Sequence, residues 1–180
     1  LGVPVLDADE ISHQLTAPGQ PVVAEIAKTF GEKVLTNDGT LDRARVRSIV
    51  FADAEERARL EAILHPRVRR ELEYQAQSLD APYVVFAIPL LVETGRQGDY
   101  DRVLVVDAPD PLRIKWIRAR STLTKADIAA IIQSQTSREN RLTVADDILT
   151  NDGSIEDLKV QVQRLHSQYL EIAVGSKHAE

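Results

Sequence analysis

Three carboxylates follow an apolar stretch near the beginning of the sequence, in VPVLDADE (3–10). Residues 3–6 predict a short buried strand, and residues 9–15 predict the helix after it. At this junction Asp7 can cap the helix, while Asp9 and Glu10 favour its positive end. A carboxylate at the carboxyl end of a strand can also accept the proton of a bound hydroxyl during attack on phosphorus, or hold water on Mg²⁺. Taken alone, the segment favours capping.

Two other short segments carry groups that could bind a polar ligand. In His65-Pro66-Arg67 the proline can simply begin a new helix, and ligand binding requires that His65 and Arg67 face a cleft. Pro89-Leu-Leu-Val-Glu93 follows a predicted buried strand. Glu93 can therefore pair with an arginine, or it can help to line a polar pocket at the end of the sheet.

Arg120 and Arg138 flank a segment (124–135) that is rich in Ala, Ile and Gln. Thr124 predicts the start of a helix there, and the isoleucines at 128, 131 and 132 predict its apolar stripe. An exposed helical hairpin with surface arginines explains this pattern. The alternative is a lid whose arginines close over a triphosphate and stabilise the charge that develops during phosphoryl transfer.

The composition limits the classes of protein to which the chain can belong. At 180 residues, with 43% hydrophobic and 28% charged residues, it suits one globular domain with or without a small lid. The net charge of −6 argues against nucleic acid as a partner, although RIKWIRAR (113–120) is a local excess of basic residues unbroken by any acid. No apolar run approaches the about 20 residues of a membrane span, and nothing resembles a signal peptide, so we expect no membrane partner and a cytoplasmic location. There is no cysteine, and the four histidines lack metal-ligand spacing.

Helix and strand patterns alternate along the chain, which favours an α/β fold with a parallel sheet. After residues 3–6, strands are expected at 83–88, 102–107 and 146–150. Helices are expected at 21–30, within 41–79 from the capping box at Asp53-Ala-Glu-Glu56, at 111–120, and from the cap at Ser154-Ile-Glu-Asp157 to about residue 173. Pro66 should interrupt the helix in 41–79. The order predicts a doubly wound parallel sheet with helical insertions at 41–79 and 111–145, whose ligands gather at the carboxyl ends of the strands.

Several uncommon local patterns together resemble the dephospho-CoA kinases, P-loop enzymes related to the nucleoside monophosphate kinases. The matching segments are VPVLDADEISHQL, FGEKVLTNDGTLDRARVRSIVFAD, LEAILHPRVRRELE, YVVFAIPLLVETG, RVLVVDAP and QSQTSRENRLTVADDILTNDG. They occur in the family's order and spacing and cover the chain to about residue 170. The resemblance implies one P-loop NTPase-like kinase domain over 1–180, with a helical acceptor-binding insertion at 41–79 and a helical lid at 111–145.

The resemblance also implies a reaction: the γ-phosphoryl group of ATP passes to the ribose 3′-hydroxyl of dephospho-CoA, the last step of coenzyme A synthesis. Mg²⁺ would be the cofactor and ATP the co-substrate, in a monomer or weak homo-oligomer. Asp9 would be the base near the hydroxyl, and Asp7 would support the Mg²⁺ region. The remaining residues are assigned by expected ligand: His65, Arg67, Pro89, Leu90 and Glu93 to the acceptor, Arg120 and Arg138 to phosphates, and Asn151 and Gly153 to the adenine of ATP.

The sequence departs from the family in one respect. These kinases begin with a strand and a Gly-rich phosphate loop carrying GKS or GKT, and no GxxxxGK[ST] occurs here. Either about 20–25 residues before Leu1, the length of a strand, loop and helix start, are omitted, or the chain is truncated and inactive. We expect a full-length, active parent. The alternatives are a non-catalytic nucleotide- or CoA-binding remnant and another small-molecule P-loop kinase.

Overall fold

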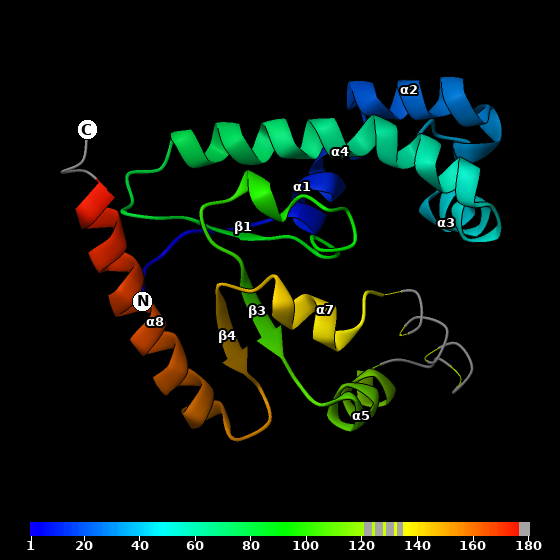
Figure 1. Ribbon diagram of the computed structural model, residues 1–180. Coiled ribbons are helices and arrows are strands. Elements are labelled where there is room, and N and C mark those ends of the chain that lie inside the picture. Colours follow the sequence, from blue (N-terminus) through cyan, green and yellow to red (C-terminus); the bar gives the residue numbers. More distant parts are fainter. Residues whose placement is uncertain (121–123, 125–127, 129–131, 133–134, 177–180) are drawn as a thin grey trace. The chain divides into compact units, whose positions relative to one another are not determined.

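The computed structural model describes residues 1–120, 124, 128, 132 and 135–176, and it divides into two compact units (Figure 1). The N-terminal unit is Gly2–Pro89, and the C-terminal unit is Leu90–Glu180 together with Leu1. Each unit contains one pair of parallel strands. The two units are therefore described separately.

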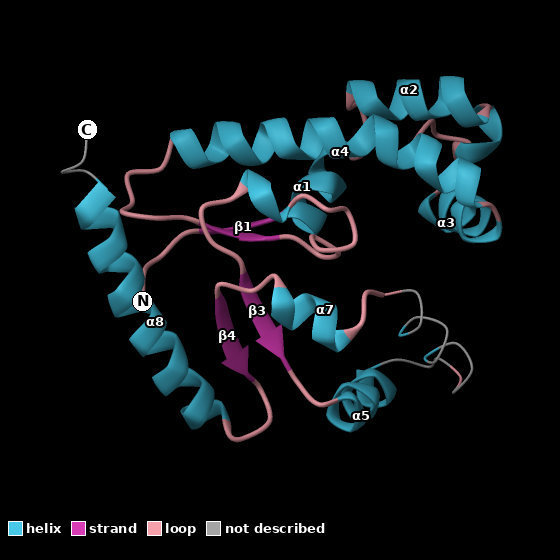
Figure 2. Ribbon diagram, viewed as in Figure 1, coloured by secondary structure: helices cyan, strands magenta, loops and turns pink. Residues whose placement is uncertain are grey.

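The N-terminal unit is built on strands β1 (Val5–Asp7) and β2 (Val85–Ala87) (Figure 2). They pair in parallel with Val5 opposite Val85 and Asp7 opposite Ala87. Helix α1 (Ala8–Leu15) begins directly after β1 and buries Ile11. Both strands are shorter than expected from the apolar runs at 3–6 and 83–88, and β1 extends to include Asp7. The carboxylate thus lies at the end of the strand itself.

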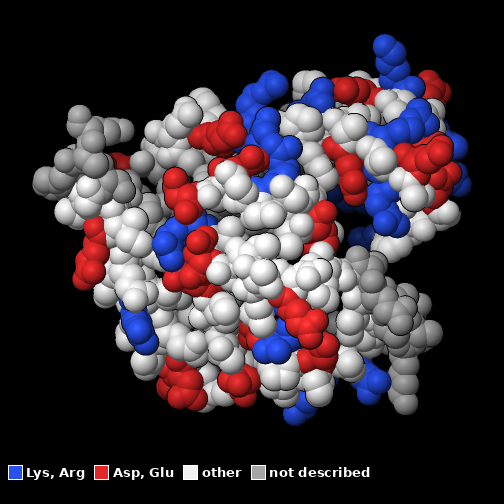
Figure 3. All heavy atoms as spheres, in the orientation of Figure 1, with Lys and Arg blue, Asp and Glu red and all other residues white. Residues whose placement is uncertain are grey.

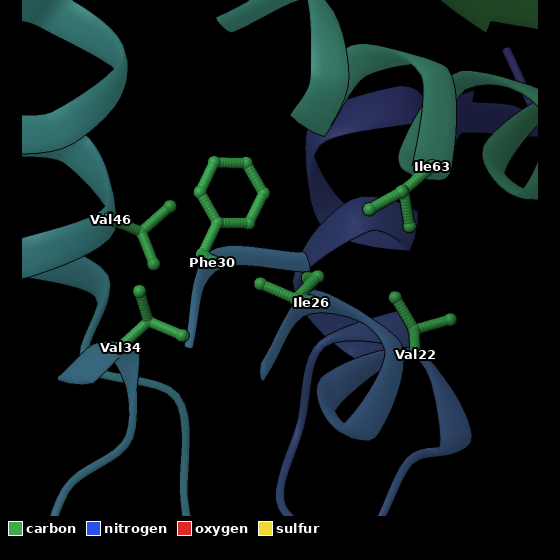
Figure 4. Close-up of a cluster of buried hydrophobic side chains, with 6 residues drawn as sticks. All are labelled: Val22, Ile26, Phe30, Val34, Val46 and Ile63. Carbon is green, nitrogen blue, oxygen red and sulfur yellow. The ribbon is translucent and has the colours of Figure 1, made fainter. Parts of the chain in front are cut away.

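Four further elements complete this unit: α2 (Pro21–Phe30), the short helix η1 (Glu32–Val34), α3 (Arg43–Ala52) and α4 (Ala54–Gln77). Helix α2 begins at a proline and ends at Gly31, whose φ of 85° suits glycine. Apolar side chains from these elements point toward one another in a single cluster (Figure 4). Its buried members are Val22, Ile26, Phe30, Val34, Val46 and Ile63. This cluster fixes α2 and α3 against α4.

Helix α4 continues through Pro66, so the expectation that Pro66 interrupts the helix is wrong. A proline inside a helix lacks its N–H and crowds the preceding turn. Here Pro66 is exposed, and Ile63 and Leu72 on either side of it are buried. The Arg67 guanidinium also donates to the carbonyl of Ile63 (2.5 Å), which supplies a donor within the affected turn. Burial of both halves of α4 outweighs the local cost.

The C-terminal unit contains η2 (Gln97–Asp99), β3 (Leu104–Asp107), α5 (Asp110–Arg120), α7 (Arg138–Thr143), β4 (Asp147–Thr150) and α8 (Ile155–Ser176). Strands β3 and β4 pair in parallel, and their last residues, Asp107 and Thr150, lie opposite each other. Tyr169 of α8 donates to Asp147 at the beginning of β4 (2.8 Å). Burial raises the pKa of the Tyr169 hydroxyl, as does its hydrogen bond to Asp147. This contact holds α8 beside the sheet.

The helix caps expected from the sequence are confirmed. Asp53 accepts hydrogen bonds from the first turn of α4, and Ser154 and Asp157 cap α8 reciprocally. In contrast, the helix expected from Thr124, with its stripe of isoleucines, falls mostly outside the described residues.

No helix among the described residues is long and apolar enough to cross a membrane. On the face shown in Figure 3, basic and acidic side chains are interspersed. No broad surface of one sign stands out on this face.

Candidate functional site

In the N-terminal unit, the acidic segment after β1 has a clear local geometry. The Oδ1 atom of Asp7 accepts hydrogen bonds from the backbone N–H groups of Asp9 (2.8 Å) and Glu10 (3.3 Å), so Asp7 caps α1. Asp9 lies in the first turn of α1 and is exposed. Its carboxylate makes no hydrogen bond or ion pair with any residue that the structure describes. Asp7 is thus engaged through one oxygen, and Asp9 is available to a ligand.

The predicted acceptor residues on α4 differ in their surroundings. His65 is exposed beside Pro66. Arg67 is half-buried, and its Nη2 donates to Glu25 of α2 (2.5 Å) while its Nη1 donates to the backbone of α4. Arg67 therefore joins α4, in the insertion at 41–79, to α2 outside it. A contact with substrate would have to preserve or replace this link.

The segment 89–93 follows β2 and crosses from one unit to the other at Leu90. Pro89 is exposed. Leu90 has a φ of 59° and is the only non-glycine residue with positive φ in the described chain. Such backbone strain is tolerated where surrounding structure enforces it, often near ligand sites. Glu93 accepts a hydrogen bond from the backbone N–H of Thr136 (2.8 Å), and no arginine pairs with it among the residues that the structure describes.

In the C-terminal unit, Asp107 ends β3 and is only 5% exposed. Arg138, the first residue of α7, donates to both of its carboxylate oxygens: Nε to Oδ1 at 2.9 Å and Nη2 to Oδ2 at 2.6 Å. These hydrogen bonds to Arg138 lower the pKa of Asp107, against the opposing effect of burial. The bidentate pair fixes the start of α7 at the end of β3.

A cavity of about 250 Å³ lies within the C-terminal unit where β3 and β4 end. Ala108, which follows β3, and Asn151, which follows β4, contribute to its wall. Their strands are tied together there because the N–H of Asn151 donates to the carbonyl of Asp107 (2.7 Å). The described residues that line it are Leu90, Glu93, Val106, Ala108, Arg113, Trp116, Gln135, Arg141 and Asn151. This is the position where parallel α/β sheets bind ligands.

Most of the charged groups in this wall already have protein partners. Arg113 donates to Asp110 (2.8 Å) and to Gln135 (2.7 Å), and Arg141 donates to the carbonyl of Thr136. Because Arg113 and Gln135 lie 22 residues apart, their contact joins the two ends of the segment between them. Arg138 itself is not in the lining. The network holds α5 and the chain before α7 in fixed relation to the cavity.

Gly153 has a structural explanation beside its predicted role at adenine. A Cβ atom at this position would lie 2.9 Å from Oδ2 of Asp157, the carboxylate that caps α8. Hydrogen bonds from Ser154 lower the pKa of Asp157 and keep that carboxylate in place. Gly153 therefore lets the loop after β4 turn tightly into α8.

The structure thus brings three of the predicted residues, Leu90, Glu93 and Asn151, to one cavity. Arg138 lies on the adjoining Asp107, and the side chain of Arg120 is outside the described residues. Asp7, Asp9, His65, Arg67 and Pro89 belong to the other unit. Sequence reasoning missed four residues of the lining: Arg113, Trp116, Gln135 and Arg141. The only signal was the basic segment RIKWIRAR (113–120), which contains Arg113 and Trp116.

The described residues contain no group of three or more His, Asp or Glu side chains that could hold a metal by themselves. Mg²⁺ seldom needs such a group, because it commonly binds one or two carboxylates and completes its shell with water and phosphate oxygens. Asp7, whose Oδ2 takes no part in the cap, fits that pattern.

Comparison with known proteins identifies the family. A family model described as dephospho-CoA kinase matches residues 1–157. The chain belongs to the dephospho-CoA kinase family. The dephospho-CoA kinase of Thiobacillus denitrificans is 48% identical over 176 residues, which cover 97% of this chain and 87% of that protein. That of Coxiella burnetii is 42% identical and covers 96% of this chain and 87% of that protein.

Solved structures support the same assignment. The crystal structure of TT1252 from Thermus thermophilus matches with a TM-score of 0.79 and 32% identity, covering 93% of this chain and 85% of that one. The dephospho-CoA kinase from Campylobacter jejuni matches with a TM-score of 0.67 and 29% identity, covering 97% and 87%. The chain is accordingly assigned to the ATP-dependent phosphotransferases of coenzyme A biosynthesis.

Proposed function

We propose that the protein transfers the γ-phosphoryl group of ATP to the ribose 3′-hydroxyl of dephospho-CoA. The observation that carries the proposal is the similarity to dephospho-CoA kinases along almost the entire chain, at 48% identity in one case. The open carboxylate of Asp9 and the cavity at the ends of β3 and β4 are consistent with it. That the four strands belong to one doubly wound sheet, as in the P-loop kinases, remains a prediction.

In the proposed reaction, the 3′-oxygen forms a bond to the γ-phosphorus as the bond to the bridging oxygen of ADP breaks. The hydroxyl proton passes to the carboxylate of Asp9. An exposed, unpaired carboxylate suits this role because it is free to accept a hydrogen bond from the substrate. Phosphoryl transfer depends mainly on positioning and charge stabilisation, so one weak base is sufficient.

Bound Mg²⁺ would neutralise charge on the phosphates of ATP. Asp7 is the proposed protein ligand of Mg²⁺, directly or through water, while its Oδ1 keeps the first turn of α1 in place. His65, Arg67, Pro89, Leu90 and Glu93 remain the proposed acceptor residues. Arg120 and Arg138 are proposed for the phosphates, and Asn151 and Gly153 for adenine. No residue is assigned here to the cradle for the β- and γ-phosphates, because GxxxxGK[ST] does not occur in this sequence.

The reaction is tested with the full-length protein, ATP, Mg²⁺ and dephospho-CoA in a coupled assay for ADP release. We expect ADP and coenzyme A to form in equal amounts. Coenzyme A is the matched control acceptor, because its 3′-hydroxyl already carries phosphate and should give no turnover. Nucleotide binding without turnover indicates a non-catalytic remnant, and faster turnover with a nucleoside or sugar acid indicates another small-molecule kinase. Either result overturns the proposal.

A further inference from the structure

The geometry points to a further substrate contact: we propose that Trp116 packs against an adenine base whose edge is hydrogen-bonded by the side chain of Asn151. The inference rests on the proposed function, which supplies two adenine-containing substrates. It adds a residue to which neither the resemblance nor the family assignment gives a role. Trp116 is the only tryptophan of the sequence.

The first support is the shape and character of the cavity. Its volume of about 250 Å³ lies below the range of about 300–1,000 Å³ typical of sites that enclose a drug-sized ligand. This volume has room for one ring system. Trp116 supplies the only aromatic side chain among the described residues of the lining, and Leu90, Val106 and Ala108 add apolar surface. Trp116 is 38% exposed, so part of its surface remains open to a ligand.

The second support is the distribution of unused polar groups. Glu93, Arg113, Gln135 and Arg141 all make hydrogen bonds to other parts of the protein. The side-chain amide of Asn151 makes none among the described residues, although its backbone N–H is bonded to Asp107. The wall thus offers a ligand the open amide of Asn151, with one donor and one acceptor side, next to an aromatic surface.

An adenine base matches this combination. Its exocyclic amino group and adjacent ring nitrogen present a donor and an acceptor that one asparagine amide can satisfy together. Its flat surface gains from stacking on an aromatic side chain. Arg113 is engaged by Asp110 and Gln135, whereas Arg141 donates through Nη1 to the carbonyl of Thr136, so tripolyphosphate tests whether a phosphate binds here instead. Both ATP and dephospho-CoA carry adenine, and the experiment must separate them.

Tryptophan fluorescence of the full-length protein provides a direct test, with the Trp116→Phe variant as the spectral control. ADP, dephospho-CoA and inorganic tripolyphosphate are titrated separately. A saturable change with ADP places the base of the nucleotide donor at Trp116, and a change with dephospho-CoA alone places that of the acceptor there. Both results support an adenine site. A change of equal size with tripolyphosphate, or no change with any of the three, overturns it.

Kinetics test whether the contact contributes to binding. Trp116→Ala should raise KM for the substrate identified by fluorescence about 10-fold, with kcat little changed. Trp116→Phe should recover most of that loss, because phenylalanine also stacks. Asn151→Leu, of similar size, should raise the same KM and weaken the preference for ADP over GDP. Lys115→Ala, an exposed neighbour on α5 outside the cavity lining, is the control.

An unchanged KM in both Trp116→Ala and Asn151→Leu overturns the inference even when turnover is normal. If Trp116→Ala does not fold, Trp116→Phe and the titrations of the unaltered protein still decide the question. Conversely, a specific fluorescence change in a protein without kinase activity would retain the adenine site and refute the proposed reaction. The two failures are therefore distinguishable.

Discussion

Asp7 and Asp107 are the last residues of two parallel strands, and the protein uses them differently. Asp7 at the end of β1 is exposed and accepts only backbone N–H groups of the next helix. Asp107 at the end of β3 is buried and paired in bidentate fashion with Arg138. The same residue type at the same position in a strand is thus open to ligand in one unit and committed to structure in the other.

The difference shows what strand position does and does not specify. The end of a parallel strand brings a carboxylate to the edge where ligands bind. Whether it remains available depends on a cation supplied by a distant part of the chain. Arg138 lies 31 residues beyond Asp107, whereas no basic side chain pairs with Asp7 or Asp9 among the described residues. Variants at these positions should separate chemistry from architecture.

The largest effect is expected for Asp9→Asn. If Asp9 is the base, this isosteric change should lower kcat by about 10²–10⁴-fold while ATP binding and the unfolding free energy change little. Glu10→Gln is the matched control, because Glu10 lies in the same helical turn and, among the described residues, its side chain accepts a hydrogen bond from Gln14 alone. The coupled ADP-release assay measures both. Full activity of Asp9→Asn would remove the proposed base.

Next in size is Arg138→Ala, which distinguishes a structural arginine from one that also reaches phosphate. Contact with the transferring phosphoryl group predicts a fall in kcat of about 10²-fold, larger than any rise in KM for the acceptor. Asp107→Asn should lower kcat much less, since it removes only the partner that holds Arg138. Equal effects of the two variants, with no further loss in the double variant, would make Arg138 purely a positioning residue.

A smaller effect, on stability, is expected for Asp107→Asn. Loss of the charge-assisted hydrogen bonds to a buried carboxylate should lower the unfolding free energy by about 2 kcal/mol in denaturant titrations. Asp110→Asn removes an exposed partner of Arg113 and should cost no more than about 0.5 kcal/mol. Similar costs for the two variants would contradict the distinction between a buried and an exposed aspartate.

The pair with Arg138 also makes a prediction about pH. Because the pKa of Asp107 is lowered in the folded state, its contribution is complete above the ordinary pKa of an aspartate. It should decline as the pH falls through the lowered value. The difference in unfolding free energy between the unaltered protein and Asp107→Asn should therefore be constant near neutral pH and shrink in acid. A difference that grows in acid would show the opposite sign of coupling.

The features that the sequence could predict are the local ones. The caps at Asp53 and at Ser154 with Asp157 involve residues two or three positions apart, so side-chain chemistry and spacing suffice. Glu93 with Thr136, 43 residues apart, and Arg67 with Glu25, 42 apart, depend on how the chain folds back. The continuity of α4 through Pro66 is a tertiary effect as well, because burial on both sides overrides the local preference of proline.

The smallest predicted effect concerns Asp7 and uses an internal twin. Asp53 caps α4 with the same geometry, its Oδ1 accepting at 2.8 and 3.3 Å from the second and third residues after it. Replacing either aspartate by alanine should lower the unfolding free energy by about 1 kcal/mol, and asparagine should restore it at both sites. Capping alone predicts that the two positions behave alike in every assay.

A role in Mg²⁺ binding predicts that they differ in one assay. Asp7→Asn keeps the cap but removes the charge, so it should raise the Mg²⁺ concentration needed for half-maximal activity, whereas Asp53→Asn should not. Because both variants retain their helix cap, a shift confined to Asp7 cannot be attributed to fraying of α1. An identical Mg²⁺ dependence in both variants would leave Asp7 as a cap alone and place the metal ligands elsewhere. The comparison thus tests the role of the charge of Asp7 in Mg²⁺ binding separately from the role of its hydrogen bonds in the cap.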